Sequence, residues 1–164
     1  MPALDPAKWN FYVGPGSGML DGNWSSNISD ANPVLTNNLK LGMCGVQYIP
    51  FCQRYLMIQW YYPSVLTGSL DSSLTVWDVY ESGTPWGPWN LIQSRSWGAG
   101  QAFYTPFVIS KSLAADGGQT AMLATAGDFA DSSATGSYTL TLIPMTISAT
   151  SPGLPMRTRL RLRP

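Results

Sequence analysis

The stretch RYLMIQWYY at residues 54–62 decides the fold because it is apolar on both sides of an extended chain. Side chains of a strand point alternately to opposite faces, so a strand with one wet face alternates apolar and polar residues. From Leu56 to Tyr62 every residue is aliphatic or aromatic except Gln59 and the thioether Met57. We therefore expect a strand covered on both faces, as in a β-propeller blade that has a neighbouring sheet on each side. A sandwich covered on both faces inside a larger assembly is the alternative.

The residues around this stretch predict an all-β chain. Only 11% of the 164 residues are charged, and 16 glycines and 13 prolines suit a chain with many tight turns. No window keeps the 3.6-residue apolar period of an amphipathic helix. Turn signals separate apolar runs at 43–49, 54–62, 73–80, 89–97, 103–110, 120–127 and 138–147, which we predict to be strands.

The order of these runs suggests a repeat. Residues 43–97 and 103–147 form two successive units, and a period of about 45–55 residues is typical of propeller blades. Residues 8–14 read as an orphan outer strand of an earlier blade. Residues 1–147 are thus predicted to be a partial β-propeller of about two to two and a half antiparallel four-stranded blades. The basic residues 148–164 are predicted to be a flexible tail.

Several function classes are disfavoured. The formal net charge of zero gives no long-range attraction to nucleic acid or to an anionic membrane. No run of about 20 apolar residues predicts a membrane span, and the start MPALDPAKW does not read as a signal peptide. The chain has no histidine, the usual general base and commonest metal ligand. We therefore expect no metal site and, without a nucleotide, haem or flavin motif, no cofactor. Cys44 and Cys52 are expected to be buried free thiols.

Three segments carry a resemblance to a known family: VQYIPFCQRYLMIQWYYP (46–63), LTVWDVYESGTPWGPWNLI (74–92) and the later DGGQT turn (116–120). Their succession resembles the C-terminal half of a glycoside-hydrolase-like five-bladed β-propeller family of uncharacterised function, found in secreted microbial and fungal proteins and similar in architecture to arabinanase and xylosidase propellers. The resemblance spans roughly residues 5–147. It implies an extracellular location, a glycan-handling cleft at the centre of the ring, and preceding blades that this chain does not supply.

Glycoside hydrolysis requires two carboxyl groups across the scissile bond. The predicted inner strands, 43–49 and 103–110, contain no Asp or Glu, which argues against a module that hydrolyses glycans alone. Asp30 and Asp128 are the candidate catalytic acids. Asp78 lies in mid-strand beside Trp77, where a carboxylate is expected to hold strands together by hydrogen bonds.

In a propeller, loops alternate between two faces. The expected ligand face carries residues 14–42, 63–72, 98–102 and 128–137, and the opposite face carries the turns at 50–53, 81–88 and 111–119. The candidate ligand-binding residues on the first face are aromatic: Trp24, Trp60, Tyr61, Tyr62, Trp97 and Phe129. Such rings stack on the C–H faces of sugars. Trp86 and Trp89 of TPWGPW are instead expected to form a packing corner, so Trp89→Ala should affect stability rather than binding.

The sequence therefore predicts a carbohydrate-binding or carbohydrate-processing module with an oligosaccharide or polysaccharide ligand, not catalytically complete alone. The alternative is a structural or interaction protein. In that case the open ring, with its uncovered sheet faces, pairs with another chain or with a second copy as a homodimer.

Overall fold

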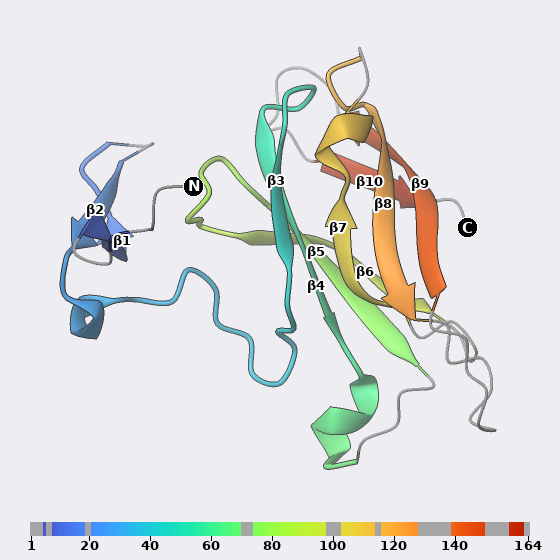
Figure 1. Ribbon diagram of the computed structural model, residues 1–164, viewed down its shortest axis with the longest axis horizontal. Helices are drawn as coiled ribbons and strands as arrows, with labels where there is room; N and C mark the ends of the chain where they lie inside the picture. Colours follow the sequence, from blue (N-terminus) through green and yellow to red (C-terminus); the bar gives the residue numbers. More distant parts are fainter. Residues whose placement is uncertain are drawn as a thin grey trace.

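The computed structural model describes residues 5, 8–18, 21–69, 74–97, 103–113, 116–127, 139–149 and 158–162, and Figure 1 shows its ribbon. The strands are β1 (Phe11–Pro15), β2 (Gly22–Ser25), β3 (Gly45–Ile49), β4 (Arg54–Tyr61), β5 (Thr75–Ser82), β6 (Asn90–Trp97), β7 (Phe103–Val108), β8 (Thr120–Gly127), β9 (Thr139–Ala149) and β10 (Thr158–Leu162). Short 3-10 helices are η2 (Ile28–Asp30), η3 (Pro63–Thr67) and η4 (Ser110–Ser112). In this described part, no helix has the length and hydropathy needed to cross a bilayer.

The strands form three antiparallel sheets, none of them closed, which confirms the predicted all-β class. Strands β3-β4-β5-β6 make one four-stranded sheet and β7-β8-β9-β10 make another, each with its strands in sequence order. Strands β1 and β2 form a separate hairpin. Neighbouring strands within each sheet follow one another along the chain, so short turns suffice to connect most of them.

One hydrophobic core lies between the two four-stranded sheets (Figure 1). The first sheet contributes Ile49, Leu56, Ile58, Trp77, Val79 and Trp97, and the second contributes Phe103, Val108, Ala121, Leu123, Ile143, Met145 and Ile147. Their spacing follows the two-residue period of a strand, and Leu123 is the direct cross-strand partner of Ile143. The two predicted repeat units therefore bury their apolar faces against each other.

Strand β4 is covered on its other face as well, as RYLMIQWYY predicts. Leu56 and Ile58 face the core, whereas Met57 and Gln59 face the opposite side, and all four are buried. The cover on that side is the extended run of residues 33–43, here called the covering segment. Its Asn37 side chain donates a hydrogen bond to the Tyr80 hydroxyl at 3.0 Å.

A second set of contacts fixes the far end of the covering segment. The Lys40 ammonium lies 5.5 Å from the centre of the Tyr61 ring, a distance at which a cation is attracted to the ring face. The Trp60 indole donates a hydrogen bond to the Met43 carbonyl at 3.1 Å. Side chains of β4 and β5 thus hold this irregular run of chain along the sheet.

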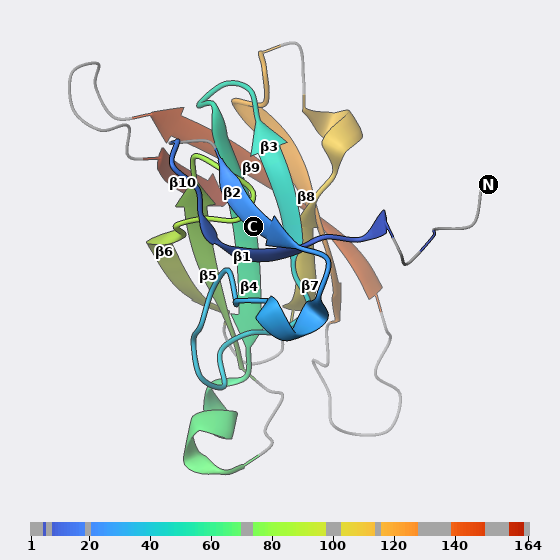
Figure 2. The same ribbon diagram turned by 90° about the vertical axis from the view of Figure 1, so that its left-hand side faces the viewer.

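Figure 2 views the molecule from the hairpin side and shows β1 and β2 in front of the β3–β6 sheet. In Figure 1, β3 and β4 lie between the hairpin and the second four-stranded sheet. The hairpin is therefore on the outer side of the first sheet, joined to it by the covering segment.

Two predictions on the chain ends need correction. Residues 8–14 were expected to contribute an unpaired strand, but β1 pairs with β2, with Tyr12 directly opposite Trp24. The expected flexible tail is wrong for Thr158–Leu162, because this strand pairs antiparallel with β9 and is the fourth strand of its sheet. The alternation of Arg with Leu and Thr in RTRLRL has the two-residue period of a strand. The positive charge of its arginines led instead to the prediction of a solvent-exposed tail.

The expected grouping of turns is confirmed at one end of the sheets. The turn at 50–53 meets the turn at 111–119, where the Phe51 amide donates to the Gly117 carbonyl at 2.8 Å. The expected separation of the 14–42 loop from the 81–88 turn is wrong, because Trp24 and Trp86 are in ring contact. The covering segment runs along the first four-stranded sheet, so the 14–42 loop has contacts near both ends of that sheet.

A shared core predicts cooperative loss of both sheets. Leu123 of β8 is 0% exposed, and Leu123→Ala is expected to lower the free energy of unfolding by about 3 kcal/mol. Tryptophan fluorescence, which reports mainly on the first sheet, and far-UV circular dichroism should show one coincident transition. Leu91→Ala, at an exposed position of β6, should change stability by less than about 0.5 kcal/mol. Two separate transitions would contradict the shared core.

Candidate functional site

Three aromatic rings meet where the hairpin faces the turn between β5 and β6. Tyr12 and Trp24 are cross-strand partners, with ring centres 5.7 Å apart and planes at 72°. Trp86 of the turn lies 5.4 Å from Trp24, edge to face at 89°, and 6.3 Å from Tyr12, nearly parallel at 26°. Edge-to-face and offset-stacked pairs add about 0.5–1.5 kcal/mol beyond area burial. This aromatic contact fastens the hairpin to the first sheet.

A pocket of about 380 Å³ lies beside these rings. Its lining residues are Tyr12, Trp86, Pro15, Pro33, Pro88, Val34, Gly18, Gly87 and Asp21. Apart from Asp21 they carry no charge, and most are apolar or aromatic. An apolar, ring-lined concavity with one polar group at its edge is the usual composition of a small-molecule site. We call this the hairpin pocket.

The turn side of the hairpin pocket is shaped by local hydrogen bonds and by Gly87. The Thr84 amide donates a hydrogen bond to the Ser82 hydroxyl at 3.1 Å, and the Thr84 hydroxyl donates to the Gly87 carbonyl. Gly87 has φ of +98°, which a residue with a Cβ rarely adopts, and the Gly87–Pro88 peptide is cis. These constraints present Trp86 toward the hairpin.

The hairpin side depends on the tight GPGSG loop after β1. The Gly16 amide donates to the Asp21 carbonyl at 2.9 Å, and the Asp21 amide donates to the Gly18 carbonyl at 3.2 Å. A Cβ at Gly16 would lie 2.7 Å from the Asp21 Cβ, and one at Gly18 would overlap the Asp21 carboxylate. The two glycines therefore leave the space in which the Asp21 side chain lies at the pocket.

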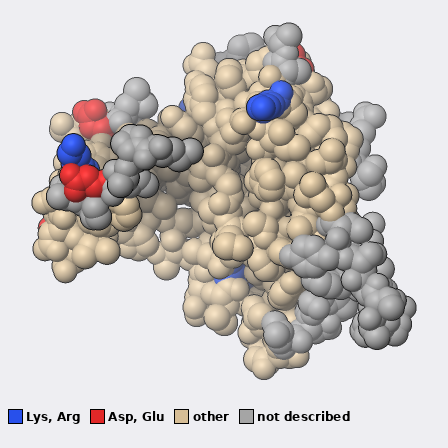
Figure 3. All heavy atoms as spheres, in the orientation of Figure 1, with Lys and Arg blue, Asp and Glu red and all other residues tan. Residues whose placement is uncertain are grey.

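Asp21 is the available acceptor of this site. Its carboxylate makes no hydrogen bond or ion pair with any residue that the structure describes, unlike Asp30, which accepts from the Ser25 hydroxyl at 2.6 Å. Figure 3 shows a largely uncharged face of the molecule on which acidic and basic side chains gather over the hairpin. A ligand in the pocket would thus meet ring faces and one unengaged carboxylate.

The two tryptophans of the TPWGPW turn lie in different surroundings. Trp89 is half-buried, and its indole N–H is buried without a hydrogen-bond partner, as in a packing corner. Trp86 instead lines the hairpin pocket. The sequence predicts a packing corner for both tryptophans. The placement of Trp89 agrees with that prediction, whereas Trp86 lies at the pocket.

Of the five candidate ligand-binding residues that the structure describes, Trp24 alone lies in the aromatic cluster at the hairpin pocket, where it is 49% exposed. Trp97 is 2% exposed in the core, between Trp77 and Phe103 and under the guanidinium of Arg95. Its ring faces are therefore occupied by the protein. Phe129 lies outside the described residues.

The three aromatic residues that end β4 and follow it form a different group. Trp60 is edge to face with Tyr62 at 5.2 Å and tilted against Tyr104 at 5.5 Å, and it packs against the core. Tyr61 faces the covering segment. Burial raises the pKa of the Tyr61 hydroxyl above its ordinary value, and the negative charge of Asp78 acts in the same direction. These rings are held by protein contacts and are not among the lining residues of the hairpin pocket.

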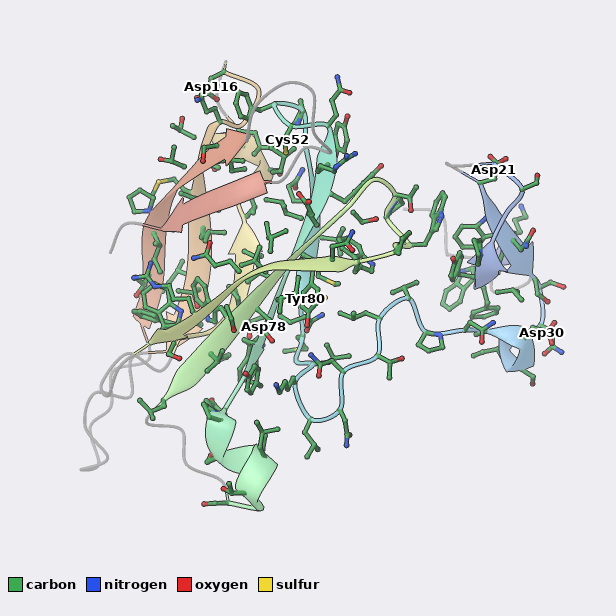
Figure 4. All side chains as sticks on the ribbon, turned by 180° about the vertical axis from the view of Figure 1, so that it is seen from behind. Asp21, Asp30, Cys52, Asp78, Tyr80 and Asp116 are labelled. Carbon is green, nitrogen blue, oxygen red and sulfur yellow. The ribbon has the colours of Figure 1, made fainter. Side chains whose placement is uncertain are left out.

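The four aspartates labelled in Figure 4 lie apart from one another. Figure 4 shows Asp21 and Asp30 near opposite ends of the hairpin region, Asp78 in the first four-stranded sheet and Asp116 at a distant turn. Asp78 is buried and accepts a hydrogen bond from the Ser94 hydroxyl of β6, the structural role expected for it. Asp128 lies outside the described residues.

The Asp116 carboxylate organises its own turn. The hydrogen bond from the Thr120 hydroxyl is the main cause that lowers the pKa of Asp116, and backbone amides of the same turn act in the same direction. The Gly118 amide donates to this carboxylate at 3.0 Å. The DGGQT sequence is thereby explained as turn chemistry.

Both cysteines are free thiols, Cys52 buried and Cys44 exposed, so the expectation of two buried thiols is wrong for Cys44. Burial of part of its side chain nevertheless raises the pKa of Cys44, which keeps it as a protonated thiol at neutral pH. Within the described ranges, no group of three or more Cys, Asp or Glu side chains could hold a metal ion.

Sequence reasoning missed Tyr12 and Trp86 as site residues. Tyr12 follows Phe11 in a predicted strand, and Trp86 was placed at the wrong end relative to the hairpin. The sequence did hold one signal for Trp86: a turn with two tryptophans is expected to pack each indole against another part of the protein. The partner of Trp86 was predictable only from the path of the covering segment.

Comparison of the chain with protein-family models, with curated proteins and with solved structures found no match.

Proposed function

We propose that this protein binds a saccharide chain in the hairpin pocket. The observation that carries the proposal is the pairing of two ring-bearing walls, Tyr12 and Trp86, with the unengaged carboxylate of Asp21. Flat rings stack against the C–H faces of a pyranose, and a carboxylate accepts hydrogen bonds from its hydroxyl groups. Trp24, partly exposed beside Trp86, extends the ring surface for a neighbouring sugar unit.

The proposal is binding rather than hydrolysis. Most glycosidases use two carboxyl groups roughly 5–10 Å apart across the scissile bond. Asp21 is the only carboxylate among the lining residues of the hairpin pocket, and Asp30 lies at the other end of the hairpin region (Figure 4). Stacking and hydrogen bonding need no second acid, so these residues suit recognition.

We also infer that the two four-stranded sheets are consecutive blades of a partial β-propeller. Both sheets keep strict sequence order, and they pack face to face through one core. The first strands of the two sheets, β3 and β7, are neighbours, since a Cβ at Gly45 would lie 2.9 Å from the Cβ of Phe107. This arrangement agrees with the resemblance to secreted, glycoside-hydrolase-like propellers, and with it we propose an extracellular protein.

A second candidate function, self-association, is favoured by exposed apolar side chains on the outer face of the second sheet. In one cross-strand row Phe107 and Leu142 flank the buried Ala124, with Leu140 beyond them. Leu140 is 71% exposed, Leu142 53% and Phe107 45%. Such a row on a sheet face is a typical interaction surface.

The absence of charged side chains among the described residues on the outward side of β8 and β9 suits a second copy of the chain as its partner. None of the residues that share the outward side of β8 and β9 with this row is charged: Thr120, Met122, Ala124, Ala126, Leu140, Leu142, Pro144 and Thr146. Two copies can therefore bring these faces together without burying charge, and the net charge of zero gives no overall repulsion.

Saccharide binding is tested by isothermal titration calorimetry and affinity electrophoresis with plant and fungal polysaccharides and their oligomers. Trp86→Ala removes one wall of the hairpin pocket and should weaken binding about tenfold. Trp9→Ala removes a tryptophan ring that is 49% exposed, more than Trp86, and that lies outside the pocket lining, so it should leave affinity unchanged. Absence of binding to every saccharide, or equal loss in both variants, would contradict the proposal.

Self-association is tested by size-exclusion chromatography with light scattering over a range of concentrations. The wild type should form a dimer, and Leu142→Lys should shift it to a monomer because a charge would be buried at the interface. Leu91→Lys places the same charge at an exposed position of β6 and should leave the dimer intact. A wild type that is monomeric throughout rules out this second function.

A further inference from the structure

We propose that the hairpin pocket prefers cationic amino sugars, such as chains of glucosamine, over neutral and anionic saccharides. This inference rests on the proposed saccharide binding and adds the charge class of the ligand. It is carried by the one charged group of the pocket and by the rings around it.

The first observation is the sign of the charge. Asp21 is the only charged residue among those that line the pocket. The two lysines of the same N-terminal part, Lys8 and Lys40, are not lining residues, and Lys40 is held over the Tyr61 ring. An ammonium group in the pocket would be attracted by the Asp21 carboxylate, whereas a uronate carboxylate would be repelled.

The second observation is that the Asp21 carboxylate is unengaged. Among the described residues none donates a hydrogen bond to it, while Asp30 and Asp116 are both satisfied within their own turns. Gly18 leaves the space that the carboxylate occupies, because a Cβ there would overlap it. The carboxylate therefore keeps its capacity to accept hydrogen bonds from a ligand.

The third observation is the aromatic surroundings. The faces of tyrosine and tryptophan rings carry partial negative charge and attract cations within about 6 Å of the ring centre. Tyr12 and Trp86 line the same pocket as Asp21, and the faces of both rings can attract a cation in this way. An amino sugar satisfies both features at once, with its C–H face on a ring and its ammonium group near the carboxylate.

The experiment compares three ligands by calorimetry: glucosamine oligomers, N-acetylglucosamine oligomers of equal length and linkage, and galacturonate oligomers. In mildly acidic buffer of low salt the glucosamine amine is protonated, so the first two ligands differ in charge and acetylation. The glucosamine oligomer should bind about fivefold more tightly than its acetylated counterpart and still more tightly than the galacturonate. Added salt should reduce this preference.

Two matched variants assign the preference to one carboxylate. Asp21→Asn should abolish the fivefold difference, because it should weaken binding of the glucosamine oligomer more than binding of the acetylated oligomer. Asp30→Asn makes the same change of charge in η2, which follows the hairpin and is outside the pocket lining, and should keep the difference. Far-UV circular dichroism checks that both variants are folded.

The outcomes separate the two proposals. If acetylated or galacturonate oligomers bind as tightly as glucosamine oligomers, or if Asp21→Asn keeps the preference, the charge inference is overturned and saccharide binding stands. If no oligomer binds to the wild type at all, the proposed function itself fails.

Discussion

The structure depends on covering both faces of β4 and of its neighbour β5, because the side chains of β4 are too apolar to leave either face in water. One face is buried by the second four-stranded sheet through the shared core, and the other by the covering segment. The second cover is irregular chain, so it must be fastened by side chains such as Asn37 and Lys40 rather than by a strand ladder. Burial of a large apolar side chain contributes about 1.5–3 kcal/mol, which exceeds what single hydrogen bonds to the segment supply.

The position of the candidate site follows from this cover. Since the covering segment crosses the outer face of the first sheet, it brings the β1–β2 hairpin to the turn after β5, where Tyr12 and Trp24 meet Trp86. The hairpin pocket is thus built from residues far apart in the sequence, joined by the same run of chain that completes the core. Stability of the sheet and geometry of the pocket are physically coupled through this segment.

The sequence predicted the elements whose signals are local. The apolar run of β4, the turn signals and the two repeat units led to the observed strands and to the double burial of β4. Strand β10 was missed because its arginines suggested solvent. The pocket itself was not predicted: Trp24, which lies beside it, was named for its chemistry, but none of the lining residues was among the candidates. The contact of Trp24 with Trp86 spans a long separation in the sequence, and residues 33–43 have no periodicity from which their path could be read. Long-range contacts of irregular chain leave little trace in a single sequence.

Neighbouring residues of β4 that point to opposite faces give the most direct test of this account. Ile58→Ala removes a side chain from the shared core, and Met57→Ala removes one from the face under the covering segment. If both faces are covered, each substitution should lower the free energy of unfolding in chemical denaturation by about 2–4 kcal/mol. A cost for Met57→Ala below about 0.5 kcal/mol, as at an exposed site, would contradict double coverage and with it the placement of the hairpin pocket.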